Sequence, residues 1–327
     1  MNILLWAPMF FGYEQQIKDH LISTGHEVHL IHDRPFKSSF LRAITAKFPN
    51  VMSYLLIPHY KKKLRAINKN FDYILVIKGQ TLSPAIMDYI LSKHTNAIKI
   101  LYLWDSIKNS KNATKNLNKF DNVFSFDITD CQNFKFSYRP LFYSLNFDRT
   151  FHLKENHDTR NFVVGFLGTI HSDRLNIINR FLSHNPSLFF KKFMYLHKPW
   201  VFIIKYLIDK SFRPYKKSNF EYTSLTLNEA AIFLSKCDAV LDIEHINQTG
   251  LTMRTIECIG LNKRLITTNK SVLSHDFYNR KTVYVIDRDH PVVPENFLNA
   301  KEFSGYPQEI RFKYSLEGWI KDVFNFS

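Results

Sequence analysis

Short runs of apolar residues alternate with helical patterns along most of the chain. The first apolar run covers residues 3–6, and a loop with Pro and Gly follows it. A helical pattern at 14–23 then leads to a second apolar run at 27–32. Short continuous apolar runs between helical patterns are typical of strands that are buried on both faces of a parallel sheet. The beginning of the chain therefore predicts an α/β domain built from βαβ units.

The same alternation continues and then restarts after a polar stretch at residues 144–160, which is a candidate linker. Further strands are expected at 73–77, 98–103, 123–126, 136–139, 162–167, 189–195, 239–243, 264–268 and 282–286, and helices at 84–92, 172–182 and 227–235. We therefore predict two α/β domains of similar size, at residues 1–150 and 151–310. Residues 311–327 are expected to form a helix that packs back on the first domain.

Polar residues follow several of the predicted strands. In parallel sheets ligands collect at the carboxyl ends of the strands, so these positions are candidate sites. Asp105, in the tripeptide WDS, follows the strand at 98–103 and is a candidate general base. The alternative is that Asp105 or Ser106 caps the next helix. Four other acids at or near strand ends are weaker candidates of the same kind. They are Asp33, Asp127, Asp130 and Glu244.

The segment VVGFLGTIHSDR, residues 163–174, is the first stretch that indicates anion binding. Gly165 and Gly168 are expected to flank the end of a strand, and Ser172 or Asp173 to cap the following helix. Backbone N–H groups at a helix start, together with the helix dipole, attract anions. The side chains of Thr169, His171 and Arg174 can add hydrogen-bond donors. His171 is also a candidate base. The alternative is an ordinary tight turn between a strand and a helix.

The segment QTGLTMRTIECIGLNKRLITTN, residues 248–269, is the second stretch that indicates anion binding. A helix that begins near Leu251 or Thr252 would direct N–H groups toward the same edge of the sheet. Arg254 can pair with a phosphate, and the Glu257 carboxylate can accept hydrogen bonds from ribose hydroxyls. The alternative is that Glu257 lies on a solvated helix face, but its nearest neighbours in the sequence are apolar.

The net charge of +15 limits the classes of partner. Either the surface is simply rich in solvated lysine, or the partner is anionic: a nucleic acid, nucleotide phosphates or an acidic membrane face. Basic and aromatic residues are mixed at 60–65 and 200–217, which fits lipid headgroups or a solvated helix face equally well. No sequence signature of a known nucleic-acid-binding module supports a nucleic acid as the partner. Three widely spaced cysteines, without metal-ligand spacing, indicate reduced thiols and a cytoplasmic location.

Two segments, VGFLGTIHSDR and GLTMRTIECIGLNKRLITTN, resemble the donor-binding half of GT-B glycosyltransferases. The likeness is to bacterial enzymes of lipopolysaccharide and capsule assembly, to CgeB-type proteins and to GT4-like donor domains. It implies two Rossmann-like domains with parallel sheets that face a central cleft. The acceptor would bind the first domain and a nucleotide-sugar the second. The family generally needs no bound metal, and the nucleotide-sugar serves as co-substrate without a further cofactor.

The resemblance also assigns roles to residues. Glu257 matches the family glutamate that contacts the donor ribose, and Gly168 and Thr169 match the turn that faces the diphosphate. Many retaining members carry a second glutamate eight positions earlier, where this chain has Thr249, so the stereochemistry stays open. In an inverting enzyme Asp105 would deprotonate the acceptor hydroxyl while phosphate donors stabilise the leaving nucleotide.

The leading expectation is a cytoplasmic glycosyltransferase that adds a sugar to a saccharide or lipid-linked acceptor in surface-polysaccharide synthesis. It would be free or peripheral at the inner face of the cytoplasmic membrane, and no nucleic-acid partner is expected. Two alternatives stay open. One is a basic nucleic-acid-binding protein, and the other is a non-catalytic nucleotide-binding relative with the same fold.

Overall fold

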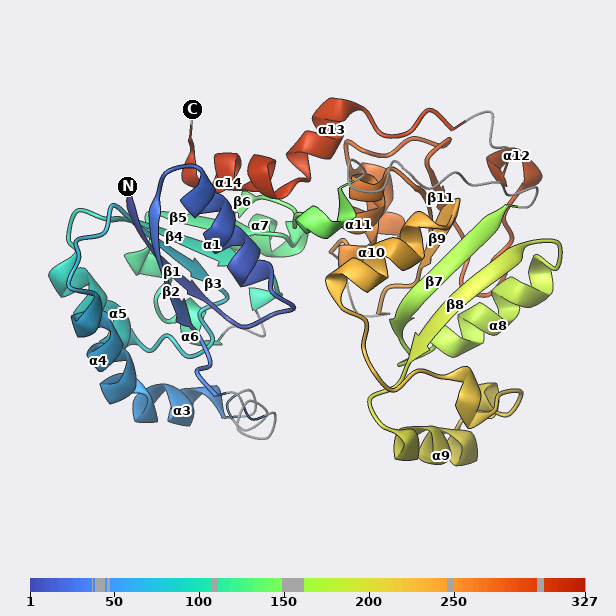
Figure 1. Cartoon of the computed structure of the whole chain (residues 1–327), viewed down its shortest axis with the longest axis horizontal. Helices are drawn as coiled ribbons and strands as arrows, with labels where there is room; N and C mark the ends of the chain where they lie inside the picture. The colour runs from blue at the N-terminus through green and yellow to red at the C-terminus, as the bar shows by residue number, and fades with distance from the viewer. Residues whose placement is uncertain are drawn as a thin grey trace. The chain divides into compact units, whose positions relative to one another are not determined.

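The computed structural model describes residues 1–36, 38, 45, 48–107, 111–148, 162–245, 250–298 and 303–326. The chain divides into two units (Figure 1). Unit 1 contains Met1–Leu141 and Leu316–Ser327, and unit 2 contains Phe142–Ser315. Most of the predicted linker, from residue 149 onward, lies outside the described residues, whereas Leu145–Phe147 forms a short 3-10 helix in unit 2.

Unit 1 is built around a six-stranded parallel sheet with the order β2-β1-β3-β4-β5-β6. Its strands are β1 (Asn2–Ala7), β2 (Glu27–His32), β3 (Tyr73–Ile77), β4 (Ile98–Leu103), β5 (Asn122–Ser125) and β6 (Ser137–Tyr138). Its helices are α1 (Tyr13–Ser23), α3 (Pro49–Leu55), α4 (Ile57–Ile67), α5 (Pro84–Lys93), α6 (Lys111–Thr114), α7 (Ile128–Phe134) and α14 (Leu316–Phe324).

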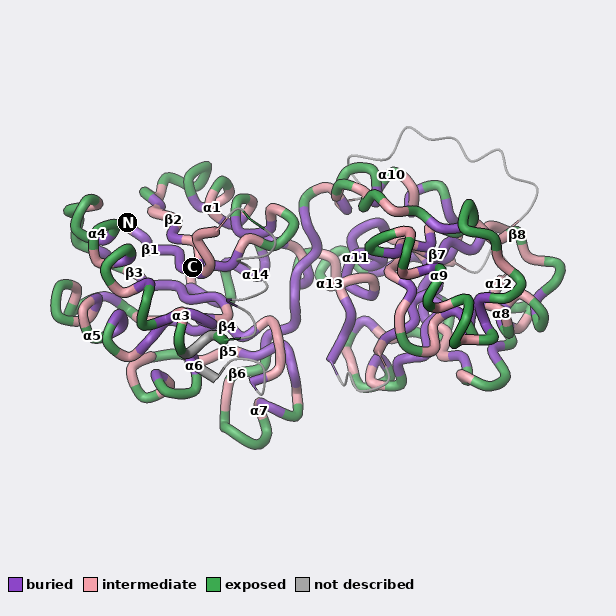
Figure 2. The backbone as a smooth tube through the Cα atoms, turned by 90° about the horizontal axis from the view of Figure 1, so that it is seen from below, coloured by how far each residue is buried: buried purple, intermediate pink, exposed green. Residues whose placement is uncertain are grey.

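Both faces of this sheet are covered, which explains the continuous apolar runs in its strands. Leu4 and Trp6 of β1 pack in a cluster with residues of α4 and α5. On the other face, the Tyr102 ring of β4 contacts Trp319 of α14, with ring centroids 4.8 Å apart. In Figure 2 the strands run as buried tubes through the unit. The last helix of the chain therefore completes the core of the unit that contains the first strand.

Unit 2 contains a five-stranded parallel sheet with the order β11-β10-β9-β7-β8. Its strands are β7 (Val163–Thr169), β8 (Phe189–Tyr195), β9 (Ala239–Asp242), β10 (Arg264–Thr267) and β11 (Val283–Val285). Its helices are α8 (Arg174–His184), α9 (Pro199–Ile208), α10 (Leu227–Ser235), α11 (Met253–Leu261), α12 (Glu295–Leu298) and α13 (Gln308–Lys313).

The two sheets share one strand order. In each unit the second strand lies outside the first, and the third strand lies on the other side of the first. The strand order reverses between β1 and β3 in unit 1, and between β7 and β9 in unit 2. In doubly wound sheets ligands bind at the carboxyl ends of the strands on either side of such a reversal. The predicted fold class of two Rossmann-like units with parallel sheets is confirmed.

Candidate functional site

Asp242 ends β9 beside the strand reversal of unit 2, and its carboxylate is buried. One oxygen accepts hydrogen bonds from three threonine hydroxyls, at 2.8 Å from Thr252, 3.0 Å from Thr255 and 3.3 Å from Thr267. Burial raises the pKa of Asp242, and the hydrogen bond from Thr252 opposes that shift. The carboxylate thus joins β9, β10 and the start of α11.

Thr252 also fixes where α11 begins. It is the N-cap residue, and its hydroxyl accepts a hydrogen bond from the Thr255 N–H at 3.1 Å. The prediction of a helix starting near residue 252 is confirmed, and the helix ends at Leu261. Thr249, where the second family glutamate would stand, lies outside the described residues.

Arg254 and Glu257 lie one turn apart on α11 and form an ion pair. Glu257 is only 5% exposed, so the alternative of a solvated helix face is wrong. A buried carboxylate needs a partner for its charge, and Arg254 supplies one. The two residues predicted to contact a nucleotide are therefore held together. The charge of Arg254 also lies close enough to contribute to lowering the pKa of Arg174, after the larger effect of burial.

The glycine-containing segment differs in part from the prediction. Gly165 and Gly168 do not flank a strand end, because β7 continues through both glycines to Thr169. The strand is longer than expected because Thr169 still pairs with Tyr195 of β8. Helix α8 begins at Arg174 with Asp173 as its N-cap residue, but the Asp173 side chain makes no capping hydrogen bond.

Arg174 bridges the two strands that meet at the reversal. Its Nε donates to the carbonyl of Ile243 at 2.7 Å, and its Nη1 to the carbonyl of Thr169 at 3.0 Å. These contacts hold the carboxyl ends of β7 and β9 together. A contact between Arg174 and a phosphate stays a prediction, and the guanidinium has a structural function in addition.

His171 follows β7 at the same edge. Its Nδ1 lies 3.1 Å from the Ser172 hydroxyl, and its ring centroid lies 5.6 Å from that of His245. Burial, together with the smaller effect of the nearby charge of Arg174, lowers the pKa of His171 to about 4. The imidazole is therefore neutral near pH 7 and can accept or donate a hydrogen bond there, but it brings no positive charge to a phosphate.

An ion-pair network that the sequence analysis missed joins three loops at this edge. Arg288 donates to Asp173 Oδ2 at 2.7 Å and to both Glu244 Oε1 and the Glu244 carbonyl, at 2.7 and 2.8 Å. Glu244 follows β9 and was only a weak candidate, and Arg288 follows β11. The strand-end rule applied to the last strand would have found Arg288. The Asp173 carboxylate thus contacts Arg288 and not the first N–H groups of α8.

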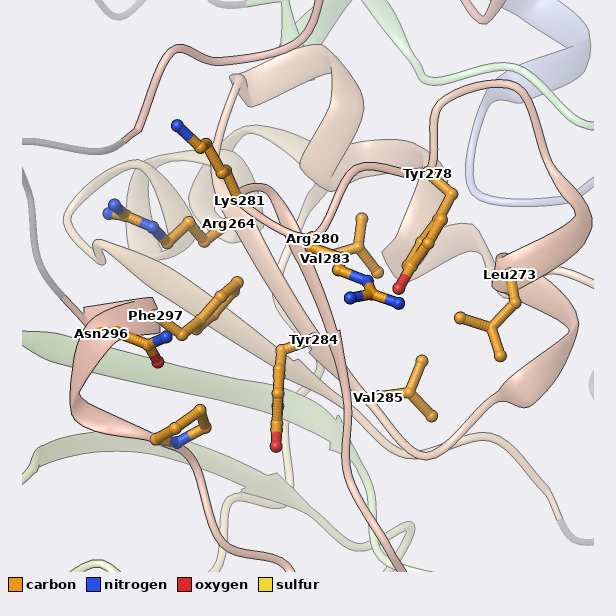
Figure 3. A pocket seen from close by; sticks show the side chains of 11 residues that line it. Arg264, Leu273, Tyr278, Arg280, Lys281, Val283, Tyr284, Val285, Asn296 and Phe297 are labelled. Carbon is orange, nitrogen blue, oxygen red and sulfur yellow. The ribbon is translucent and has the colours of Figure 1, made fainter.

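The polar side chains of unit 2 thus gather at one edge of the sheet. The candidates there are Gly168, Thr169, His171, Arg174, Thr252, Arg254 and Glu257, joined by Asp242, Glu244 and Arg288. A separate cavity of about 540 Å³ lies beside β10 and β11, and it is lined by residues that include Arg264, Tyr284 and Phe297 (Figure 3). None of these candidates lines that cavity. Within the described ranges, no group of three or more His, Cys, Asp or Glu residues is arranged to hold a metal ion.

Asp105 belongs to unit 1. Its Oδ2 lies 2.8 Å from Lys78 Nζ, and its Oδ1 accepts a hydrogen bond from the Ser106 N–H at 3.0 Å. Lys78 follows β3, so the pair spans the ends of two neighbouring strands. The Asp105 side chain is 36% exposed, which leaves it accessible at the strand-end edge. Its role as a base stays a prediction.

The weaker acidic candidates of unit 1 have structural contacts. The Asp33 side chain is buried and accepts hydrogen bonds from Trp6 Nε1 and from the N–H groups of Gln80 and Thr81. Asp127 caps α7, and Asp130 accepts a hydrogen bond from the Ile107 N–H. Tyr60, in one of the two basic and aromatic segments, is buried and donates to the Asp33 carbonyl at 2.7 Å, so it cannot face a membrane.

No protein-family model and no curated protein matches the sequence. Solved structures do match. The Anabaena protein Alr3699/HepE in complex with UDP-glucose aligns with a TM-score of 0.62 at 12% identity, over 99% of this chain and 98% of that one. The UDP-GlcNAc 2-epimerase of Neisseria meningitidis bound to UDP-GlcNAc aligns with a TM-score of 0.59 at 10% identity, over 99% of each chain.

A third match is an alpha-glucosyltransferase in complex with UDP and a 13-mer DNA containing an A:G mismatch. Its TM-score is 0.58 at 13% identity, over 99% of this chain and 95% of that one. All three likenesses extend over nearly the whole of both chains, so they concern both units. At these identities they establish the fold. The chain has the GT-B fold, with two Rossmann-like units.

Proposed function

We propose that the protein is a glycosyltransferase that moves a sugar from a nucleotide-sugar to a saccharide or lipid-linked acceptor. One observation carries the proposal. The charged residues of unit 2 gather at the strand reversal of a fold whose solved examples hold UDP or UDP-sugars. That edge is where such sheets bind nucleotides.

The residues of unit 2 suit the parts of a nucleotide-sugar. The N-terminus of α11 and the Arg254 guanidinium would face the diphosphate, and Glu257 the ribose hydroxyls. Their ion pair keeps both side chains in place before the donor arrives. His171, neutral near pH 7, would donate a hydrogen bond to a phosphate oxygen or accept a proton. The role of Glu257 follows the resemblance of residues 250–269 to the family's donor-site helix, and the other roles follow from the chemistry of the side chains and of the helix start.

We propose further that transfer needs no metal and takes place at the inner face of the cytoplasmic membrane, in surface-polysaccharide synthesis. The sequence resemblance to enzymes of that pathway supports this. No helix in the described part of the chain is long and apolar enough to cross a membrane. The role of Asp105 separates two mechanisms. In an inverting enzyme Asp105→Asn abolishes transfer and leaves donor binding unchanged, whereas in a retaining enzyme transfer survives.

The donor is tested with the purified chain and a panel of nucleotides and nucleotide-sugars, by saturation-transfer NMR and by nucleotide release. We expect binding of one nucleotide class. Glu257→Gln should weaken it about tenfold, the equivalent of one charge-assisted hydrogen bond of ~1.5 kcal/mol. Glu229→Gln is the matched control, because Glu229 is an exposed acid of the same unit that contacts Thr226 in a capping box. Failure to bind any member of the panel would refute the proposal.

Two further outcomes would redirect the assignment. A change of configuration in UDP-GlcNAc incubated without acceptor would assign sugar epimerisation, a reaction that one structural neighbour is named for. DNA is a second candidate acceptor. It is favoured by the net charge of +15 and by the neighbour solved with UDP and DNA. Transfer of labelled sugar to duplex DNA, with binding that weakens steeply as salt increases, would establish it.

A further inference from the structure

Helix α9 has its apolar stripe on the outside. Five residues at positions i, i+3, i+4, i+7 and i+8 form one continuous face of the helix, and all are exposed. Their exposed fractions are 60% for Trp200, 54% for Ile203, 47% for Ile204, 72% for Leu207 and 74% for Ile208. In a surface helix of a globular protein this stripe normally faces the core. Here it faces away from the unit, so its apolar area needs another explanation.

The orientation of α9 is fixed by its opposite face. Phe202 is 8% exposed, and its ring centroid lies 5.4 Å from that of Phe220 and 6.2 Å from that of Phe212. The Tyr206 ring lies 5.7 Å from Phe202 on the same side. These aromatic contacts hold the helix on the unit with its aliphatic stripe outward.

The segment that carries the stripe is rich in positive charge. Between residues 198 and 217 the sequence holds six cations and a single carboxylate, Asp209. The Asp209 side chain accepts hydrogen bonds from the N–H and the hydroxyl of Ser211, at 3.0 and 2.6 Å. The cations are Lys198, Lys205, Lys210, Arg213, Lys216 and Lys217, all exposed except Lys205, which is partly buried. An apolar stripe bordered by lysine and arginine matches an anionic lipid interface, which is apolar beneath a negatively charged surface.

The segment that contains α9, between Tyr195 and Glu221, leaves the sheet and returns to it at the carboxyl edge of the sheet. It begins after the end of β8 and returns where Glu221 pairs with Tyr195, with the Leu196 N–H donating to the Glu221 carbonyl at 2.9 Å. Figure 1 shows α9 away from the strands of unit 2, beyond the ends of β7 and β8. The charge of Lys205 also acts on His171. The helix therefore lies at the same edge as the candidate donor site.

We propose that α9 is a membrane anchor that lies in the plane of an anionic bilayer, with Trp200, Ile203, Ile204, Leu207 and Ile208 among the lipid chains and the surrounding cations at the headgroups. At ten residues the helix is about 15 Å long, which suits lying in the interface and is too short to span a bilayer. The inference deepens the peripheral location proposed above by naming the surface that contacts lipid. It does not depend on which reaction the protein catalyses.

The test is flotation of the full chain with vesicles of phosphatidylcholine, and with vesicles of phosphatidylcholine mixed with phosphatidylglycerol, without any nucleotide. We expect binding to the anionic vesicles that is at least tenfold stronger than to the neutral ones and that weakens with salt. Leu207→Ser combined with Ile208→Ser should reduce that binding at least tenfold. The matched control is Leu273→Ser combined with Val292→Ser, which removes two apolar residues that are 50% and 48% exposed elsewhere in unit 2 and should leave binding unchanged.

Trp200 supplies a direct readout of insertion. Trp6 and Trp319 are fully buried, so in a Trp104→Phe background Trp200 is the tryptophan that lipid can reach. Its emission should shift to the blue on anionic vesicles and be quenched by brominated lipid chains. Intact donor binding without vesicle binding would refute the anchor alone, and vesicle binding without donor binding would refute the proposed reaction alone.

Three results would overturn the anchor. The first is equal vesicle binding by the wild type and the Leu207→Ser, Ile208→Ser variant. The second is a dimer in sedimentation experiments that this variant loses, with no vesicle binding, which would make the stripe a contact between two copies of the chain. The third is duplex DNA binding in place of vesicle binding, lost with Lys216→Gln and Lys217→Gln but not with the serine variant. That result would assign the cations to nucleic acid.

Discussion

Gly165 lies in the middle of β7 against the turn that leads into β9. A Cβ atom at this position would lie 2.4 Å from Cys237 Sγ and 3.2 Å from Cys237 Cβ, whereas non-bonded heavy atoms prefer separations near ~3.5–4.0 Å. Cys237 is fully buried. The turn is fixed to β7 by two hydrogen bonds of 2.8 Å, from the Asp238 N–H to the Val163 carbonyl and from the Val163 N–H to Asp238 Oδ2. The extra methyl group of alanine therefore has no room.

We predict that Gly165→Ala destabilises unit 2 by ~2 kcal/mol. Overpacking a filled core costs about 1–3 kcal/mol, and the fixed turn puts this site toward the upper end of that range. Replacing glycine within a strand returns about 0.5–1 kcal/mol of backbone entropy. A net loss of ~2 kcal/mol lowers the melting temperature of a domain of this size by about 4–8 °C. The assay is a thermal melt, together with hydrogen exchange of peptides from residues 163–169, because a chain of two units need not unfold in one step.

A double mutant cycle tests the stated cause. Cys237→Ala removes the sulfur and alone should cost about 1 kcal/mol, as expected for a small buried group. In the double variant the new methyl group occupies the space of the sulfur. We therefore expect a favourable coupling of about 1–2 kcal/mol. Gly168→Ala is the control in the same strand, because its Cβ would meet only the ends of two side chains, at 3.3 and 3.4 Å. Additive effects of the two single changes would refute the reasoning.

Three other predictions concern both units. Asp33→Asn should destabilise unit 1 by about 1–3 kcal/mol in urea unfolding. The buried carboxylate accepts hydrogen bonds at both oxygens, from Trp6 and Thr81 at Oδ1 and from the Gln80 N–H at Oδ2, and an amide replaces one of these acceptors with an NH2 group; an unchanged midpoint would contradict this. His171→Gln should flatten the pH dependence of stability between about 4 and 6.5, because the lowered pKa makes the stability contributed by His171 complete above 6.5 and lost as the pH falls toward 4; a slope identical to that of the wild type would exclude it. A chain that ends at Ser315 lacks Trp319 and Phe324 of α14. We therefore expect fast hydrogen exchange throughout unit 1 and retained protection in unit 2. Protection in both units would show that the helix is dispensable.

Most of the strands could be predicted from the sequence because burial on both faces leaves a continuous apolar run. The predicted bounds agree with β2, β3, β4 and β8, and with helix α10. Helices α3 and α4 were missed as helices. Their sequences contain Pro49 and Pro58 and the basic run at 61–63, and α4 buries only Tyr60 and Leu64 on its inner face. A narrow buried face in a basic segment gives too weak a periodic signal.

The candidate site was predictable in position but not in connectivity. Strand ends indicated the correct edge, since the order of the strands follows from the alternation of elements. The partner of each charge could not be read from the sequence, because Arg288 reaches Asp173 and Glu244 across more than forty positions in the chain. Even the ion pair that lies on one helix, between Arg254 and Glu257, was not predicted, because each residue was assigned to a part of the nucleotide. The outward stripe of α9 has the same periodicity as a buried one, so only the structure shows on which side it lies.

Helix α14 sets the order in which the protein can be completed during synthesis. The six strands of unit 1 leave the ribosome before unit 2, but the helix that covers Tyr73 and Tyr102 is translated only after the whole of unit 2. At ~5–20 residues per second this interval is roughly 10 to 35 seconds, which is long compared with the folding of a domain. During that time Tyr73 and Tyr102 lack their contacts with α14. Nascent chains of this protein are therefore expected to be substrates for ribosome-associated chaperones until α14 is released.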